Sequence, residues 1–232
     1  FGTGIAASVQ PFYSPGGLFL VAVLMTFALF TMRPRAMGES FALAGRQLAG
    51  AAVALLFAVP LVRVFINSGA EFSASDLASM PLTLAEGAAT LLGGDWPVLA
   101  PWIGALGAFA AGSNTVSNLM FSLFQHATAD RIAVPAENVV AAQAAGGAAG
   151  NMITVHNVVA ASAVVGLAGR EGDLIRQTLI PLTYYLLVAG SVTYIWIYGF
   201  GLNTGTVLLA LVVAALVALA LRVRASGRAH AA

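Results

Sequence analysis

Apolar residues fall into long runs along this chain, separated by short polar or charged stretches. Residues 17–32 and 47–67 form two such runs, and residues 177–221 are uncharged over a length that suits two helices. A helix needs about 20 apolar residues to cross a bilayer. The pattern therefore predicts an all-α membrane protein with transmembrane helices in these regions, and a charged loop at residues 33–46.

The uncharged run at residues 96–129 is different, because a polar sequence interrupts it. Residues 112–118, here called the tip, read Gly-Ser-Asn-Thr-Val-Ser-Asn, and the apolar arm on each side is too short to cross a bilayer. Glycine followed by serine, asparagine and threonine ends one helix and caps the next. We therefore expect a re-entrant hairpin at residues 96–125, in which two short helices meet inside the membrane. Substrate sites in transporters are often built in this way.

The positions of arginine favour the re-entrant hairpin. Cytoplasmic loops attract basic residues. If the hairpin returns to the side that it entered, three arginine-bearing regions share one side of the membrane, namely residues 33–46, 170–176 and 222–228. A single crossing would separate them. The acidic residues 68–95 fall opposite, and residues 77–92 are expected to form a short helix along the membrane interface.

A second break is expected within the uncharged residues 138–169. Gly146 and Gly150 weaken a helix there, and Asn151, Thr154 and His156 follow closely. The spacing of the two glycines by itself indicates close helix packing. An ionisable residue inside a membrane is a candidate site, and histidines exchange protons near neutral pH, so His156 is a candidate proton carrier. The alternative is a neutral histidine bonded to a backbone carbonyl.

Polar residues after the tip recur every three or four positions and form one stripe on a helix. The stripe consists of Asn114, Asn118, Ser122 and Gln125. It is either the wall of a cavity or a set of interhelical hydrogen bonds. As the wall of a cavity, it would start with exposed N–H groups that favour an anion. The candidate substrate-binding residues are Ser113, Asn114, Thr115, Ser117, Asn118, Asn151 and Thr154.

Composition excludes several classes of function. The chain is 59% hydrophobic and 8% charged, whereas a soluble domain has about 25% charged residues. Its net charge of +1 gives no reason to expect a nucleic-acid partner. The chain has no lysine for a phosphate-binding loop and no cysteine, and its three histidines are widely spaced, so we expect no metal and no cofactor. A start without methionine or signal peptide suggests a piece of a longer protein.

Three ordered stretches resemble bacterial L-lactate permeases. They are residues 107–121, which include the tip; residues 146–162, with Gly-Gly-Ala-Ala-Gly-Asn-Met-Ile and then His-Asn-Val-Val-Ala-Ala-Ser; and residues 166–176, Gly-Leu-Ala-Gly-Arg-Glu-Gly-Asp-Leu-Ile-Arg. The tip also resembles the hairpin motif of the wider ion-transporter superfamily. There, two inverted repeats each supply a tip and a broken helix to one site.

The resemblance implies a multi-pass protein of the bacterial cytoplasmic (inner) membrane that takes up L-lactate, or related 2-hydroxy monocarboxylates such as glycolate, together with protons. Family members are about twice as long or longer. Residues 1–232 would then be a single transmembrane transport domain from the C-terminal portion, whose partner is the missing N-terminal half. Some members carry aspartate in place of Asn114 and other residues in place of His156.

Other functions stay open at this point. The chain could transport another small carboxylate or anion, be a membrane subunit without transport activity, or assemble as a homo-oligomer. An intramembrane serine hydrolase would use Ser113 as nucleophile and His156 as base. Nothing in the sequence supplies the carboxylate that would orient the histidine, and we expect a transporter and not an enzyme.

Overall fold

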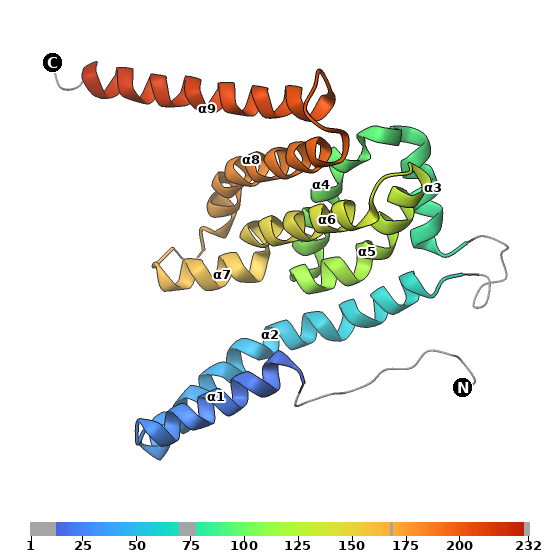
Figure 1. Cartoon of the computed structure of the whole chain (residues 1–232). Helices are drawn as coiled ribbons and strands as arrows, with labels where there is room; N and C mark the ends of the chain where they lie inside the picture. Colours follow the sequence, from blue (N-terminus) through green and yellow to red (C-terminus); the bar gives the residue numbers. More distant parts are fainter. Residues whose placement is uncertain (1–12, 70–77, 168, 230–232) are drawn as a thin grey trace. The chain divides into compact units, whose positions relative to one another are not determined.

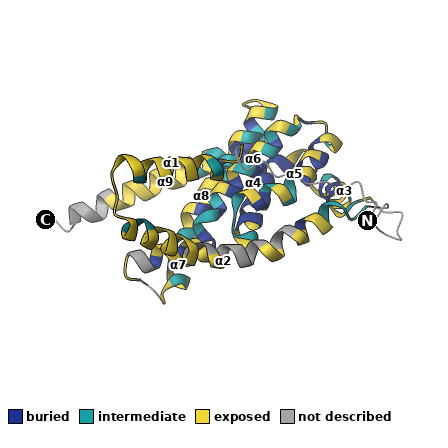
Figure 2. Cartoon of the chain, turned by 90° about the horizontal axis from the view of Figure 1, so that it is seen from below, coloured by how far each residue is buried: buried dark blue, intermediate teal, exposed yellow. Residues whose placement is uncertain are grey.

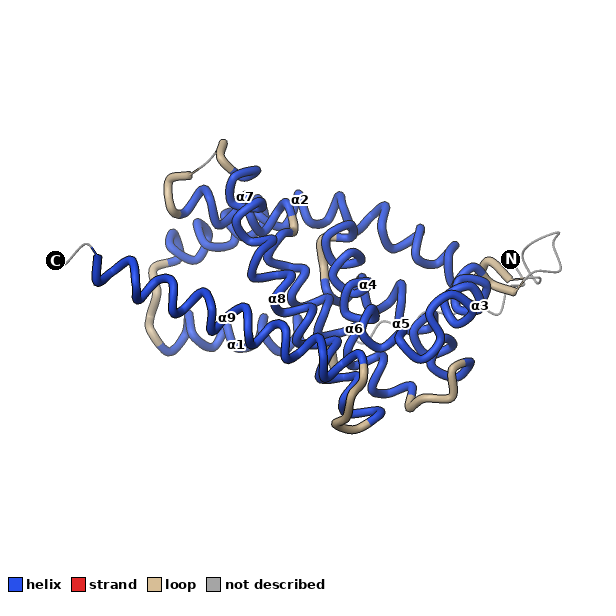
Figure 3. The backbone as a smooth tube through the Cα atoms, turned by 90° about the horizontal axis from the view of Figure 1, so that it is seen from above, coloured by secondary structure: helices blue, strands red, loops and turns tan. Residues whose placement is uncertain are grey.

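The computed structural model describes residues 13–69, 78–167 and 169–229, and in these ranges it consists of helices and loops, as Figure 3 shows. In chain order (Figure 1), the elements are α1 (Pro15–Leu29), α2 (Pro34–Ile66), α3 (Met80–Leu92), the 3-10 helix η1 (Gly93–Asp95), α4 (Trp96–Ala111), α5 (Asn114–Arg131), α6 (Ala136–Gly150), the 3-10 helix η2 (Asn151–Ile153), α7 (Val155–Val164), α8 (Glu171–Tyr198) and α9 (Thr204–Ala229). The expected all-α class is confirmed. Residues 70–77 of the expected acidic loop lie outside the described residues.

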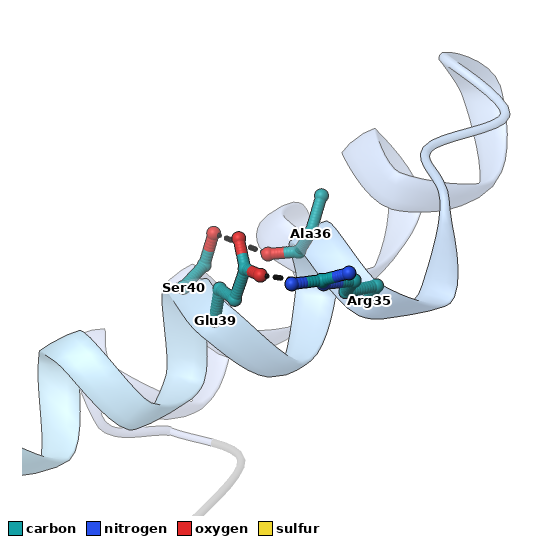
Figure 4. Close-up of polar contacts among 4 residues, drawn as sticks. All are labelled: Arg35, Ala36, Glu39 and Ser40. Atoms are coloured by element: carbon teal, nitrogen blue, oxygen red, sulfur yellow. Dashed lines mark hydrogen bonds and ion pairs between the residues drawn. The ribbon is translucent and has the colours of Figure 1, made fainter.

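The chain divides into two units, residues 1–50 and residues 51–232. In the first unit, the prediction of a charged loop at residues 33–46 is wrong, because α2 is helical from Pro34 onward. Proline suits the first position of a helix. Arg35 Nε and Glu39 Oε1 then pair at 2.9 Å, one turn apart on the helix surface, and Figure 4 shows this contact. The charges therefore lie along a helix and do not mark a loop.

The core of the second unit lies on α4, α5 and α6, where Figure 2 shows most of the buried positions in dark blue. The ring of Trp96 on α4 packs edge-on against Phe124 on α5, with ring centroids 5.2 Å apart. The short helix expected near residues 77–92 is present as α3, which buries Ala85 and Ala88 against this core.

Glycines on one face of α6 bring its backbone into direct contact with α4. A Cβ atom added to Gly146 would overlap the carbonyl oxygen of Pro101, and one added to Gly150 would lie 2.6 Å from Cα of Ala105. Glycine at such positions allows two helices to approach more closely than side chains would permit. The close packing indicated by the glycine spacing is therefore confirmed.

The break expected near residues 199–205 separates α8 from α9. Helix α8 has 28 residues, and the segment Thr204–Val223 of α9 has 20; by length and composition both can cross a membrane. The two helices meet closely, because a Cβ atom added to Gly205 would lie 2.8 Å from Cβ of Tyr194. Two of the expected spans are thus present as single long helices.

Candidate functional site

The tip joins α4 to α5 through two residues with different backbone conformations. Gly112 has φ +76°, in the left-handed region, and its N–H donates to the carbonyl oxygen of Ala108 at 2.8 Å. Ser113 is extended and caps α5, with its Oγ accepting a long 3.5 Å hydrogen bond from the N–H of Val116. The N–H groups of Asn114 and Thr115 come too early in the helix to have a partner within it. The start of α5 therefore offers free donors.

The arms of the hairpin run antiparallel. Near the tip, Ser117 on α5 bonds to Gly104 on α4, whereas Gln125, two turns further along α5, bonds to Ala100 nearer the start of α4. Two helices folded back on each other in this way present the tip as their joint end.

A second break separates α6 from α7. Between them, η2 covers three residues and Thr154 is extended, with φ −65° and ψ 126°. The Thr154 hydroxyl is within 3.3 Å of the carbonyl oxygen of Gly150 and 3.5 Å of that of Ala108, at the end of α4. The side-chain amide of Asn157 donates to the carbonyl oxygen of Asn151 at 3.1 Å. The bond to Ala108 places the start of α7 beside the end of α4.

The two breaks meet at Gly112. A Cβ atom added there would lie 2.9 Å from Cε1 of His156, 3.1 Å from its Nδ1 and 3.9 Å from Cγ2 of Thr154. Glycine is thus required twice over, by the positive φ and by the imidazole packed on it. Two residues further along, at the start of α5, the side chain of Asn114 lies against Gly147 of α6. A Cβ atom added to Gly147 would overlap Oδ1 of Asn114.

Two buried side-chain oxygens near these breaks have no hydrogen-bond partner among the described residues. They are Oδ1 of Asn118 and Oδ1 of Asn151. The amide nitrogen of Asn118 donates to Oδ1 of Asn114 at 3.3 Å, which leaves the Asn118 oxygen as the free end. Unpaired buried acceptors cost free energy and call for an explanation such as a ligand or an ordered water. The region therefore combines free backbone donors with free side-chain acceptors.

Charge is sparse here. In the part of the chain that the structure describes, no group of three or more histidine, cysteine, aspartate or glutamate side chains is arranged to hold a metal ion. His156 is exposed, in the first turn of α7. Binding of an anion at this place would rely on backbone N–H groups, side-chain amides and hydroxyls.

The structure separates the predicted residues into two groups. Ser113, Asn114, Asn151, Thr154 and His156 lie at or beside the two breaks, and Thr115 is exposed in the first turn of α5. Ser117 differs, because it is 0% exposed, donates to the carbonyl oxygen of Gly104 at 2.8 Å and accepts from Nε2 of Gln143 at 3.1 Å. These contacts are those of interhelical packing.

Gln143 is absent from the sequence-based set, although its fully buried amide contacts α5 twice. A signal was present in its spacing. Gln143, Gly146, Gly147 and Gly150 lie three, four and seven positions apart and so share the face of α6 that packs on the hairpin. A glutamine on such a face has no route to water and must bond to neighbouring helices.

Among the described residues, Ser113 and His156 share no hydrogen bond, and the Ser113 hydroxyl oxygen serves as a helix cap. A nucleophile needs a base within hydrogen-bond reach. The arrangement gives the serine hydrolase alternative no support.

Comparison with known proteins gives a consistent family. The L-lactate permease family model matches residues 3–200. The chain is 30% identical to the L-lactate permease of Salmonella typhi over 187 residues, which are 81% of this chain and 32% of that protein. It is 35% identical over 105 residues, or 45% of this chain, both to the glycolate permease GlcA of Escherichia coli K12 and to the L-lactate permease of Bacillus subtilis 168, and these residues make up 19% of each relative.

The chain spans about a third of the length of the curated relatives that it matches across most of its own length. Their names are those of transporters and not of enzymes. No solved structure matches the chain. Together with two helices long and apolar enough for a bilayer, these matches indicate a membrane protein. Because the family model covers most of its residues, the chain belongs to the L-lactate permease family.

Proposed function

We propose that this chain contributes one side of the substrate site of a proton-coupled symporter, which takes up L-lactate and related 2-hydroxy monocarboxylates such as glycolate across the bacterial inner membrane. The observation that carries the proposal is the meeting of two helix starts, at α5 and α7, where Gly112 packs against His156. The names of the relatives, which include L-lactate permeases and a glycolate permease, support the class of substrate.

A 2-hydroxy acid matches the groups that this region leaves free. Its carboxylate needs several donors, because an unpaired carboxylate is prohibitively costly to remove from water. The first N–H groups of α5, the hydroxyls of Ser113 and Thr115 and the amide of Asn114 supply them, and each helix start adds about half a positive charge. The substrate hydroxyl then donates to Oδ1 of Asn118 or Asn151, two buried oxygens that have no hydrogen-bond partner among the described residues.

Proton coupling follows from charge balance in this proposal. A lactate anion moving with one proton carries no net charge, so the pH gradient drives the step and the membrane potential does no work on it. His156 is the proposed proton carrier, because its ring lies against Gly112 at the junction of the two breaks. Thr154 and Asn151 on the same segment would complete this side of the site.

In the membrane, we propose that α4 and α5 form a re-entrant hairpin and that α6 and α7 are two halves of a broken helix. The chain would then be one transport domain of a multi-pass protein. An equivalent pair from an inverted repeat would complete the site from the opposite side. The length of the relatives leaves room for such a repeat, since this chain spans about a third of it.

The test is lactate binding to the natural full-length protein and its Asn114→Ala variant. Removing the amide leaves buried groups unpaired, so we expect binding to weaken by about 1–3 kcal/mol while the protein still folds. Leu119→Ala is the control, because Leu119 is on the same helix but 55% exposed and away from the stripe. Calorimetry measures affinity, and the size-exclusion profile measures folding. Wild-type affinity in a well-folded Asn114→Ala variant would remove the tip from the substrate site.

A further inference from the structure

A continuous line of hydrogen bonds crosses α4, α5 and α6 beneath the tip. Trp96 Nε1 donates to Oε1 of Gln125 at 2.7 Å, and Gln125 Nε2 donates to Oε1 of Gln143 at 2.9 Å. Gln143 Nε2 donates to Oγ of Ser117 at 3.1 Å, and the Ser117 hydroxyl donates to the carbonyl oxygen of Gly104 at 2.8 Å. Each donor points in the same direction along the line.

These side chains are buried. Gln125, Gln143 and Ser117 are 0% exposed, and Trp96 is 4% exposed. Gln125 Nε2 also donates to the carbonyl oxygen of Ala100 at 3.2 Å, so both of its amide hydrogens have partners. Buried polar groups persist when every one of them is paired, and a fully paired network fixes one arrangement of the helices around it.

The end of this line lies one helical turn from the proposed substrate site. On α6, Gln143 precedes Gly147 by four residues; on α5, Ser117 follows Asn114 by three. The bond between Gln143 and Ser117 and the contact between Gly147 and Asn114 are therefore successive contacts of one interface. A slip of α5 along α6 that broke the first contact would displace the second.

Because the face of α6 is rich in glycine, the register of α5 against α6 depends on the side-chain amide of Gln143. Gly146, Gly147 and Gly150 present backbone to the hairpin, and a surface without side chains has no knobs to prevent sliding. Gln143 is the polar side chain on that same face, and its two bonds to α5 are directional.

We propose that Gln143 is a positioning residue: through Gln125 and Ser117 it sets the register of α5 against α6, and so holds Asn114 at the junction with Thr154 and His156. The effect on transport rests on the proposed function. The register of the two helices does not depend on the proposed function, and a separate experiment measures it.

The experiment compares three substitutions in the natural full-length protein. Gln143→Met keeps the length of the side chain and loses both bonds. Gln143→Glu keeps one O–H donor and one acceptor in its neutral form, which burial favours. Gln177→Met makes the same change at an exposed position near the start of α8. Lactate transport gives KM and kcat, and spin labels at Leu119→Cys and Val159→Cys, both exposed and free of competing cysteines, give the distance between α5 and α7.

We expect Gln143→Met to raise KM about tenfold with kcat within about twofold, and to shift or broaden the label distance by at least about 1.5 Å, the rise of one helical residue. Gln143→Glu and Gln177→Met should match the wild type in both measurements. An unchanged label distance in Gln143→Met overturns the proposal. If that variant does not fold, Gln143→Asn, which is one methylene shorter and cannot span both partners, must shift the distance, and failure to do so overturns the proposal as well.

The two measurements separate two kinds of failure. A shifted label distance in a protein that does not transport lactate supports the positioning role and contradicts the proposed function. An unchanged distance in a lactate transporter contradicts the positioning role alone.

Discussion

The two ends of the α4–α5 hairpin contain similar polar residues in opposite states. At the base, defined here by Trp96 and Gln125 of the hairpin together with Gln143 of the neighbouring α6, the side chains are at most 4% exposed and are joined by hydrogen bonds. At the tip, Ser113 makes one long hydrogen bond, and the buried Asn118 oxygen has no partner in the part of the chain that the structure describes. The hairpin is thus fixed at one end and left chemically unsatisfied at the other.

The contrast shows what polar residues do inside a largely apolar chain. A paired amide stabilises the arrangement of helices, whereas an unpaired one costs free energy until another molecule supplies its partner. A rigid base confines the unpaired polar groups, and the free energy that they cost, to the tip. Substitutions at the base should therefore change the stability or the register of the helices, and substitutions at the tip should change transport while the fold is kept.

The largest effect is expected where the backbones of α4 and α6 touch near the base. Gly146→Ala places a methyl group against the carbonyl oxygen of Pro101, and we expect the free energy of unfolding to fall by about 1–3 kcal/mol. Thermal unfolding of the purified protein measures the change. Gly87→Ala is the matched control, because Gly87 is exposed in α3 with nothing within 4 Å of an added Cβ, and alanine there should raise stability by up to about 1 kcal/mol. Equal unfolding temperatures for both variants would contradict the close contact.

A smaller effect, confined to transport, is expected at the junction beside the tip. If His156 carries the proton, His156→Gln should keep lactate exchange and lose accumulation driven by a pH gradient. For one proton per lactate, one pH unit drives at most about tenfold accumulation, or about 1.4 kcal/mol. Proteoliposomes with an imposed gradient measure both rates. His126→Gln is the control, since that histidine pairs with Asp130 at 3.0 Å on the exposed far end of α5. Undiminished accumulation in His156→Gln would show that His156 does not carry the proton and that its ring only packs against Gly112.

The smallest effect is expected for the unpaired oxygen itself. Asn118→Ala should weaken lactate binding by about 1 kcal/mol, which is about fivefold, because the substrate hydroxyl loses its acceptor. Stability should change little, because the substitution removes one long hydrogen bond, from the Asn118 amide nitrogen to Oδ1 of Asn114 at 3.3 Å, together with an unpaired buried oxygen. Asn138→Ala is the control for the removal of an asparagine, because Asn138 lies near the start of α6, at the end of that helix far from Gly147 and the tip. A marked loss of stability with unchanged affinity would move Asn118 from the tip group to the base group.

Local features of the fold could be predicted from the sequence. The end of α4 and the start of α5 follow from Gly112 and Ser113, because a glycine with positive φ and a serine cap act within one helical turn. The break between α8 and α9 follows from the cluster of glycine and polar residues at 199–205 for the same reason. The prediction of a loop at residues 33–46 was wrong because the sequence alone does not distinguish charges on the surface of a helix from charges in a loop.

The state of each polar side chain could not be predicted. Asn118 and Gln125 belong to the same stripe, yet one has a free oxygen and the other has two fully used amide hydrogens. The difference comes from Gln143, which contacts Gln125 from another helix and 18 residues away. Spacing along α5 contains no information about what α6 places opposite it. The sequence therefore located the polar face and left both of its interpretations open.

The bare glycine face of α6 also affects how the protein can assemble. Helices that associate through the exclusion of water lose that driving force once lipid surrounds them, whereas dispersion between closely spaced atoms acts in oil as well as in water. Gly146 and Gly150 give α4 and α6 contacts of the second kind. In the proposed membrane arrangement, their association therefore does not have to be completed in an aqueous phase, because these contacts can form after lipid surrounds both segments.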